Sequence, residues 1–348
     1  MNEPPHLLVV SGFLGSGKTT LILAAARILA ARGIRCAVIL NDQGESLVDT
    51  ELARARGFAA GEVTGGCFCC RFSELMRIAD RLRADAPQVI FAEPVGSCTD
   101  LCATVLRPIE EAYGTAFQLG PLTVLVDPER AGQLDHPDIE FLFRKQLEEA
   151  DLVCFTKSDR WPQPPQPGGI AARQVSALTG QGVEAWLDEV LSGSVPLRGT
   201  IPDLDYERYA QAEAALAWLN AGAAVVTEPA VSPAMLVGPL LDRLDRELTE
   251  AGILIVHLKA IDRTATGFVK AAQCANGQEP AVEGALDASP AREHRLSINL
   301  RAVGEPGLVL SVVRSALGDL PGRADTLRID CFRPAAPKPE RRVTGGSR

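Results

Sequence analysis

Three observations predict an α/β domain with a mostly parallel sheet, followed by a smaller C-terminal α+β domain. A short apolar run, a glycine-rich turn and an Ala/Leu-rich stretch follow one another over residues 6–33. Further apolar runs of strand length recur through residues 1–198 and end at polar side chains. After residue 198 the pattern changes to amphipathic stretches and alternating strands, which is typical of an α+β domain over 199–332.

The composition limits the class of partner. The 348 residues are 46% hydrophobic and 23% charged, so the chain can bury more than one core. A net charge of −9 leaves no excess cation to neutralise phosphates, which argues against a nucleic-acid or membrane-surface binder. No apolar run approaches the roughly 18 residues of a membrane span. Because no basic segment precedes the first apolar run, we expect a cytoplasmic protein with reduced thiols.

The first turn has the pattern of a phosphate-binding loop. Gly12, Gly17, Lys18 and Thr19 complete G-x-x-x-x-G-K-[ST]. Glycines let backbone N–H groups surround a β-phosphate, and the following helix directs its positive N-terminus at the anion. Lys18 can reach the β- and γ-phosphates, and the Thr19 hydroxyl can ligate Mg²⁺. A chance glycine-rich turn is disfavoured because a strand and a helix flank it. This arrangement is a P-loop, which predicts a nucleoside triphosphate hydrolase.

A later segment predicts which base is bound. The apolar run 150–155 ends at Thr156-Lys157-Ser158-Asp159. A carboxylate at Asp159 can accept both N1–H and N2–H of guanine, while the stem of Lys157 covers the ring. The backbone of Ser176 and Ala177 can donate to guanine O6. Alone, the segment is also typical of a helix start capped by Asp159. After a P-loop it favours GTP.

Two acidic segments follow strand ends between the P-loop and the base-reading residues. In open α/β sheets, ligands bind at the carboxyl ends of the strands. After the run 88–92, Glu93 can hold Mg²⁺ or its water, and the Gly96 N–H can turn toward a γ-phosphate. A solvated loop is the alternative for the earlier segment, and we favour it for Asp42 alone. The candidates of that earlier segment are Asn41, Asp42, Glu45 and Asp49.

Three cysteines, Cys67, Cys69 and Cys70, lie between the acidic segments, before a helix predicted to begin near Ser73. The helix dipole and Arg71 should lower the pKa of these thiols. Three soft ligands on one tight loop suit Zn²⁺, Cu⁺ or a similar thiophilic ion. The fourth position is left for water, a distant side chain, a nucleotide-bound loop or a second protein. A redox pair is the alternative, because the first and third cysteines have C-x-x-C spacing, but it is disfavoured because no thioredoxin-like context surrounds them.

Two other cysteines, Cys98 and Cys102, are four residues apart and would share one face of a helix. They can supply extra ligands near Glu93, although we favour their interpretation as small buried hydrophobic residues. The remaining four cysteines lie in apolar runs and are interpreted as buried.

The segments SGFLGSGKTTL, NDQGESLVD, GGCFCC, AEPVGSCTD and TKSD, in this order, resemble the CobW-type metal-chaperone GTPases. These are relatives of the urease and hydrogenase nickel-insertion GTPases in the SIMIBI class of P-loop proteins. The resemblance covers roughly residues 6–192. It implies a GTPase that binds a transition metal at its cysteines and couples nucleotide state to metal transfer. The implied metal is Zn²⁺ first, with Co²⁺ and Ni²⁺ as alternatives, and the implied partner is a client metalloprotein, with a homodimer as a candidate assembly.

The resemblance also implies roles for particular residues. Lys18, Glu45 and Glu93 would be catalytic. Asp49 would join Thr19 and Glu93 at Mg²⁺, and Lys157 with Asp159 would bind guanine. The residues implied in phosphate binding are Gly12, Gly15, Ser16, Gly17, Lys18, Thr19 and Thr20.

The chain departs from such proteins at three points. Asp42 and Gln43 stand where they usually have a glutamate and an aromatic residue, and Thr156 replaces the usual asparagine. A histidine-rich segment is missing, since the chain has 4 histidines in all. The predicted metal site therefore depends on sulfur.

The second half predicts helices over 206–222, 232–252 and 307–320, and strands over 253–261, 267–274, 294–303 and 325–332. His257, Lys259, Asn299 and Arg301 alternate with apolar residues and are expected on a solvent-facing side of the sheet. The alternative is that they form a docking face for a client or a corrinoid-type substrate. The basic segment 333–348 is expected to be disordered.

The leading hypothesis is a GTP-hydrolysing metallochaperone or insertase. A nucleotide-binding metal- or redox-sensing regulatory module is one alternative, and an activator of a cobalamin-dependent enzyme is another.

Overall fold

A computed structural model describes residues 3–42, 53, 57–130, 134–163 and 171–344. The chain forms two compact units, one of Met1–Ala210 with Pro337–Arg348 and one of Gln211–Ala336. The boundary lies at residue 210 rather than at the predicted 198. The reason is visible in residues 199–210, where the Tyr206 hydroxyl donates to Asp100 (2.7 Å) and the Tyr209 hydroxyl accepts from the N–H of Thr99 (3.2 Å).

The first unit contains an eight-stranded sheet in the order β3-β2-β4-β1-β6-β7-β8, with β5 paired to β1. Every pairing in it is parallel. This confirms the predicted α/β class, and it brings the carboxyl ends of the strands to one edge. The strands are β1 (His6–Gly12), β2 (Cys36–Asn41), β3 (Ala59–Val63), β4 (Val89–Glu93), β5 (Gln118–Leu119), β6 (Thr123–Val126), β7 (Leu152–Phe155) and β8 (Ala171–Gln174).

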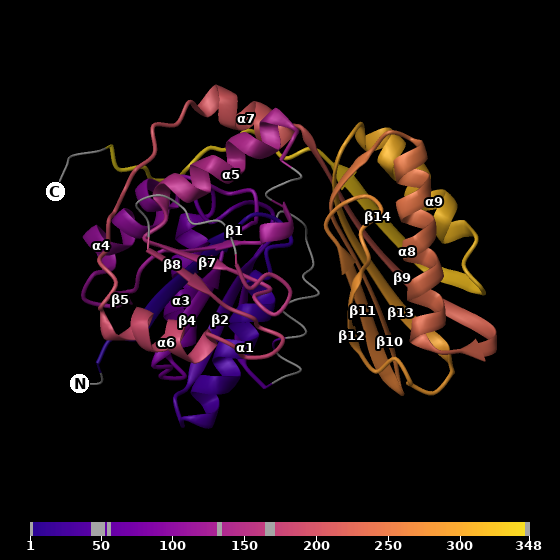
Figure 1. Ribbon diagram of the computed structural model, residues 1–348, viewed down its shortest axis with the longest axis horizontal. Coiled ribbons are helices and arrows are strands. Elements are labelled where there is room, and N and C mark those ends of the chain that lie inside the picture. Colours follow the sequence, from indigo (N-terminus) through magenta and orange to yellow (C-terminus); the bar gives the residue numbers. More distant parts are fainter. Residues whose placement is uncertain (1–2, 43–52, 54–56, 131–133, 164–170, 345–348) are drawn as a thin grey trace. The chain divides into compact units, whose positions relative to one another are not determined.

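Helices flank this sheet (Figure 1). The core on one side joins apolar side chains of two helices, including Leu21, Ile22 and Trp186, to those of five strands. The helices of the first unit are α1 (Lys18–Ala31), α3 (Phe72–Arg83), α4 (Arg107–Tyr113), α5 (Pro137–Glu149) and α6 (Val183–Ser192), with α7 (Tyr206–Ala214) crossing the boundary. A π-helical turn, η1 (Cys102–Leu106), precedes α4, and a 3₁₀ turn, η2 (Pro128–Arg130), follows β6. Within the described residues, every helix is too short or too polar to span a bilayer.

The C-terminal segment differs from its prediction. Residues 337–344 pack on the first unit, so the expectation of disorder is wrong for them. Arg342 Nε donates to the buried carboxylate of Asp100 (2.8 Å), and the Val343 N–H donates to the Ala103 carbonyl (2.9 Å). A buried carboxylate needs such a partner, and this pairing offsets the small apolar surface of the segment.

The second unit is a six-stranded antiparallel sheet in the order β12-β11-β10-β13-β9-β14. Two helices lie side by side on one face of it (Figure 1). Leu240, Leu244 and Val313 of these helices share a core with strand residues such as Leu258 and Ile298. The elements are β9 (Leu216–Val231), α8 (Pro233–Glu250), β10 (Leu254–Thr264), β11 (Gly267–Gln273), β12 (Ala281–Gly284), β13 (Ala291–Val303), α9 (Pro306–Gly318) and β14 (Arg323–Phe332). The predicted α+β class is confirmed.

Two predictions for the second unit are wrong. The helix expected over 206–222 ends at Ala214, and residues from Leu216 form the long strand β9 between β13 and β14. The expected solvent-facing row is also partly buried, since Lys259 is 7% exposed and Arg301 is 3% exposed. The Arg301 guanidinium lies 4.0 Å from the centroid of the Trp218 ring and donates to the Leu219 carbonyl (3.0 Å).

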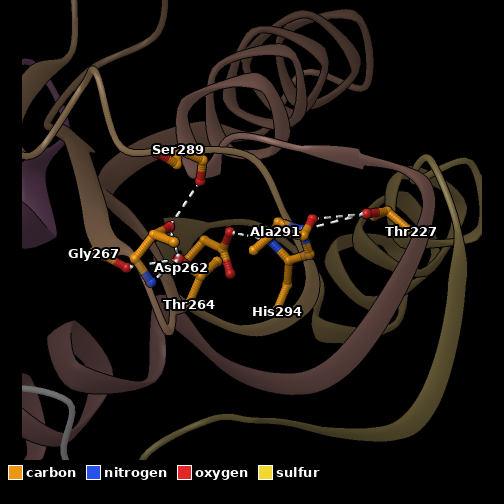
Figure 2. Close-up of polar contacts among 8 residues, drawn as sticks. Thr227, Asp262, Thr264, Gly267, Ser289, Ala291 and His294 are labelled. Carbon is orange, nitrogen blue, oxygen red and sulfur yellow. Dashed lines mark hydrogen bonds and ion pairs between the residues drawn. The ribbon is translucent and has the colours of Figure 1, made fainter.

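A buried polar cluster connects three strands of this sheet (Figure 2). Asp262 Oδ2 lies 2.6 Å from His294 Nδ1, and both side chains are fully buried. His294 Nε2 lies 3.0 Å from the Ala291 carbonyl, to which it must donate because a carbonyl only accepts. The Thr227 hydroxyl donates to the same carbonyl (3.3 Å). Since these contacts satisfy both ring nitrogens, the cluster has a structural role.

Candidate nucleotide and metal site

The phosphate cradle is the turn between β1 and α1. Gly12 has φ of 137°, and a Cβ there would lie 2.4 Å from the Leu125 carbonyl oxygen, so only glycine can occupy this position. The Ser16 N–H donates to the Phe13 carbonyl (3.0 Å), which closes the turn. The half-buried Gly15 and Gly17 also have left-handed backbones. Together they allow the chain to enter α1 at Lys18.

Lys18 lies inside the cradle. Its side chain is buried, and its ammonium group donates to the carbonyls of Gly12 (2.8 Å) and Phe13 (3.4 Å). The Ser16 hydroxyl is buried and has no hydrogen-bond partner in the described part of the chain. An unpaired buried hydroxyl is unfavourable, so a ligand that accepts from it would complete the loop. Both groups are placed to bind an anion such as the β-phosphate.

A hydroxyl and a carboxylate meet beside the cradle. The Thr19 hydroxyl donates to Glu93 Oε1 at the end of β4 (3.1 Å). Oxygen ligands of this kind are those that Mg²⁺ accepts, so the pair fits the predicted magnesium position. Thr20, the next residue of α1, is half-buried. The predicted residues Glu45 and Asp49 lie outside the described residues.

Gly96 follows β4 and packs directly against the cradle. A Cβ at this position would lie 2.9 Å from Lys18 Nζ and 3.0 Å from Leu14 Cα. The backbone after Glu93 therefore lies against the ammonium group that would bind the terminal phosphates.

The base-reading residues lie around the end of β7. Asp159 is exposed, and its carboxylate makes no hydrogen bond within the described residues. Lys157 has φ of 56°, and its ammonium group lies 2.7 Å from Asp127 Oδ2, which fixes the stem. The Ser176 N–H donates to the Gln181 carbonyl (2.9 Å), so it is not available to guanine O6. Of the predicted donor pair, the half-buried Ala177 is the one that can serve.

The three sulfurs of the cysteine loop converge. Sγ of Cys67 lies 2.7 Å from that of Cys69 and 3.2 Å from that of Cys70, and the latter two are 3.7 Å apart. The loop is closed by the Cys70 and Arg71 N–H groups, which both donate to the Cys67 carbonyl (3.0 Å each). Three thiols in this arrangement can hold one metal ion.

The side chain of Asn41 holds the start of this loop. Its amide nitrogen donates to the carbonyls of Val63 (3.0 Å) and Gly66 (2.7 Å). Asn41 ends β2, so the end of that strand is joined directly to the residue before Cys67. From the sequence, Asn41 was grouped with the acidic candidates, and its hydrogen bonds to the start of the cysteine loop were not predicted.

The protonation of the thiols differs from the prediction that all three have a lowered pKa. Hydrogen bonds from the Cys69 and Cys70 thiols lower the pKa of Cys67 well below its usual value. The same contacts raise the pKa of Cys69, and the Cys67 contact raises that of Cys70 to about 11. Arg71 pairs with Glu74 instead (2.9 Å). One thiol of the three is therefore predisposed to ionise, through its neighbouring sulfurs and not through Arg71.

The C-terminal segment covers the cysteine loop. The Lys338 N–H donates to Cys70 Sγ (3.2 Å), and the Glu340 N–H donates to the Cys69 carbonyl (2.9 Å). The Glu340 carboxylate accepts from the Ser73 N–H (2.9 Å) and hydroxyl (2.6 Å). It thereby caps the N-terminal turn of α3, where a negative charge is favourable. Sequence reasoning missed these residues, and a basic, proline-rich composition contains no signal for them.

Comparison with known proteins agrees with this arrangement. Residues 6–178 match the family model described as "CobW/HypB/UreG, nucleotide-binding domain". This part of the chain is a CobW/HypB/UreG nucleotide-binding domain. The match covers β1 through β8, and therefore includes the cradle, the cysteine loop and the base-reading residues described above.

Curated relatives carry zinc chaperone names. The chain is 34% identical over 162 residues to "Zinc chaperone YeiR" of Escherichia coli, which covers 44% of this chain and 46% of that protein. It is 31% identical over 184 residues to "Zinc chaperone CobW" of Pseudomonas aeruginosa, covering 44% and 48%. The match thus spans about half the length of these relatives. Among solved structures, HypB from Helicobacter pylori in complex with nickel is 18% identical, with a TM-score of 0.41 over 54% of this chain and 86% of that chain.

Proposed function

We propose that the protein is a GTP-hydrolysing metallochaperone or insertase, which binds a thiophilic metal at Cys67, Cys69 and Cys70 and delivers it to a client metalloprotein. The observation that carries the proposal is the convergence of three sulfurs in the same unit as the phosphate cradle. Zn²⁺ is the first candidate cargo, because relatives are named zinc chaperones and thiolates suit this ion. Co²⁺ and Ni²⁺ are the alternatives.

The nucleotide chemistry follows from residues of the cradle. The buried ammonium group of Lys18 leaves the carbonyls of Gly12 and Phe13 and pairs with the β- and γ-phosphates. Thr19 and Glu93 hold Mg²⁺, which neutralises charge that develops on the phosphates. Asp159 accepts from guanine, and this exposed carboxylate selects GTP over ATP because adenine lacks the matching pair of donors.

The protonation and the exposure of the three thiols determine how the metal is bound and transferred. A thiol gives its proton to solvent when it ligates the ion as a thiolate, so binding is favoured at higher pH. Cys70 is half-buried while Cys67 and Cys69 are buried, so a client approaches the ion from the side of Cys70 once the Lys338 N–H has left the Cys70 sulfur. Metal binding and transfer take place in the cytoplasm, where thiols stay reduced.

The test is a direct comparison of two sites in the purified full-length protein. Replacing Cys67, Cys69 and Cys70 together by Ser should abolish tight Zn²⁺ binding and leave GTP binding unchanged. Wild-type protein should hydrolyse GTP slowly and leave ATP nearly untouched. Tight Zn²⁺ binding by the triple variant would refute the metal site, and equal use of ATP and GTP would refute the assignment of guanine.

A further inference from the structure

The C-terminal segment crosses the cysteine loop at its least buried cysteine. Cys67 and Cys69 are buried, whereas Cys70 is half-buried. The Lys338 N–H donates to Cys70 Sγ (3.2 Å), and the Glu340 N–H donates to the Cys69 carbonyl (2.9 Å). Both donors belong to the backbone, so the approach of the segment to the loop does not depend on the rotamer of a flexible side chain.

Two anchors hold the segment further along the chain. Arg342 Nε donates to the carboxylate of Asp100 (2.8 Å), which is buried, and the Val343 N–H donates to the Ala103 carbonyl (2.9 Å). Each residue of 337–344 is itself exposed or half-buried. Hydrogen bonds and an ion pair therefore hold the segment, rather than a core of apolar side chains. A segment held in this way can detach locally while the rest of its unit stays folded.

The charge of the segment complements that of a loaded cysteine loop. Residues 337–344 contain three cationic side chains, Lys338, Arg341 and Arg342, and one anionic side chain, Glu340. Zn²⁺ held by three thiolates carries a net negative charge, which nearby cations and N–H donors stabilise. The segment lies outside residues 6–178, which match the family model, so that match assigns it no role.

We propose that residues 337–344 form a strap that retains the metal, in which the Lys338 N–H donates to the Cys70 thiolate that ligates the ion. The inference rests on the proposed function and adds the C-terminal segment to its metal site. A hydrogen bond to a ligating atom fixes that ligand in place, and its loss weakens metal binding by about 10–100-fold. The strap also lies on the side of Cys70, where a client would reach the ion. Its departure therefore loosens one ligand and opens the site in the same step.

The test compares Lys338→Pro with Lys338→Ala in the full-length protein loaded with Zn²⁺. Proline removes the N–H donor, whereas alanine removes the side chain and keeps the donor. Because Lys338 precedes Pro339, its backbone is already restricted to extended conformations that proline also adopts. Lys338→Pro should release Zn²⁺ to a competing chelator about tenfold faster than wild type, and Lys338→Ala should stay within about twofold of it. Binding of a GTP analogue verifies that each variant is folded.

Hydrogen exchange of zinc-loaded wild type gives a second measurement, which does not depend on a variant's folding. The amides of residues 337–344 should exchange at least about tenfold more slowly than those of a free peptide of the same sequence.

Three outcomes would overturn the strap and leave the three-cysteine site intact. These are release from Lys338→Pro at the wild-type rate, equally fast release from Lys338→Ala and Lys338→Pro, and amides of 337–344 that exchange as in the free peptide. A wild type that binds no Zn²⁺ tightly would instead refute the proposed metal site, and the inference with it.

Discussion

The two sites of the first unit are built in different ways. The phosphate cradle comes from one continuous stretch, residues 12–20, whose glycines and helix start determine its shape. The sulfur site is assembled from residues 67–70 and from the C-terminal segment at Lys338 and Glu340. The comparison teaches that the first site depends on local backbone geometry, whereas the second depends on tertiary packing. Changes to them should therefore have separable effects.

The largest separable effect is expected for Lys18→Ala. Removing the buried ammonium group leaves the phosphates without their cation, and losing one partner of a buried ion pair costs about 3–5 kcal/mol. GTP affinity should fall by at least about 100-fold, while Zn²⁺ affinity without nucleotide stays the same. Titration calorimetry with each ligand checks this. Lys145→Ala, which alters a surface pair with Glu148, is the control and should change neither. If the Lys18→Ala protein kept wild-type GTP affinity, the cradle would not be the phosphate-binding site.

The next effect tests the segment that follows Glu93. Gly96→Ala places a methyl group 2.9 Å from Lys18 Nζ and 3.0 Å from Leu14 Cα, so the segment must move away from the cradle. Because Lys18 is placed to bind the phosphates, GTP should bind more weakly by about tenfold, or ~1.4 kcal/mol, while Zn²⁺ affinity without nucleotide stays the same. The control is Gly238→Ala in α8, where an added Cβ has no atom within 4 Å. If Gly96→Ala left GTP binding unchanged, the close approach of position 96 to Lys18 would have no part in nucleotide binding.

A pH effect of intermediate size is expected at Glu149. This carboxyl is fully buried, accepts from the Thr99 hydroxyl (3.2 Å) and the Cys102 N–H (3.0 Å), and burial raises its pKa from 4.5 to about 8. Between these values the folded state holds a proton that the unfolded state releases. Stability should therefore be greatest below the lower value and fall as pH rises, by up to about 1.4 kcal/mol per unit.

Glu149→Gln tests this expectation, because a neutral amide cannot titrate. Urea unfolding measured between pH 5 and 8 should show a shallower fall of the free energy of unfolding in the variant. The neighbouring Glu148→Gln, at an exposed position of the same helix, should leave the slope as in wild type. An unchanged slope in Glu149→Gln would assign the pH dependence to other groups.

The smallest effect is expected for the segment that covers the cysteine loop. Glu340→Gln removes the negative charge at the start of α3. A charge at this position stabilises a helix by about 0.3–1 kcal/mol. Zn²⁺ should leave for a competing chelator up to about fivefold faster, with GTP affinity unaffected. Glu279→Gln, at an exposed position of the second unit, is the control. A release rate identical to wild type would mean that residues 337–344 do not hold the metal site.

The difference between the two sites also explains what could be predicted from the sequence. Gly12, Lys18 and Thr19 were recognisable because the motif contains the geometry, and Glu93 with Gly96 followed from a strand end beside it. Cys98 and Cys102 were interpreted as small buried residues, and they are 1% and 2% exposed. The roles of Lys338 and Glu340 had no local signal.

Two errors have the same physical origin. Residues 215–222 are rich in alanine and leucine and are equally compatible with a helix, and it is their pairing with β13 and β14 that makes them the strand β9. Arg71 was expected to act on the cysteines because it is adjacent to them in sequence. In the folded chain it lies one helical turn from Glu74 and pairs with it, which a helix beginning at Phe72 makes favourable.

The most direct test of the account is the Zn²⁺ affinity of the full-length protein in two nucleotide states. Competition with a calibrated chelator gives Kd for Zn²⁺ in the presence of excess Mg²⁺ and either a non-hydrolysable GTP analogue or GDP. Because the proposed function couples the nucleotide state to metal transfer, the two constants should differ by at least about tenfold, or ~1.4 kcal/mol. Equal constants in the two states, with both nucleotides bound, would contradict the coupling.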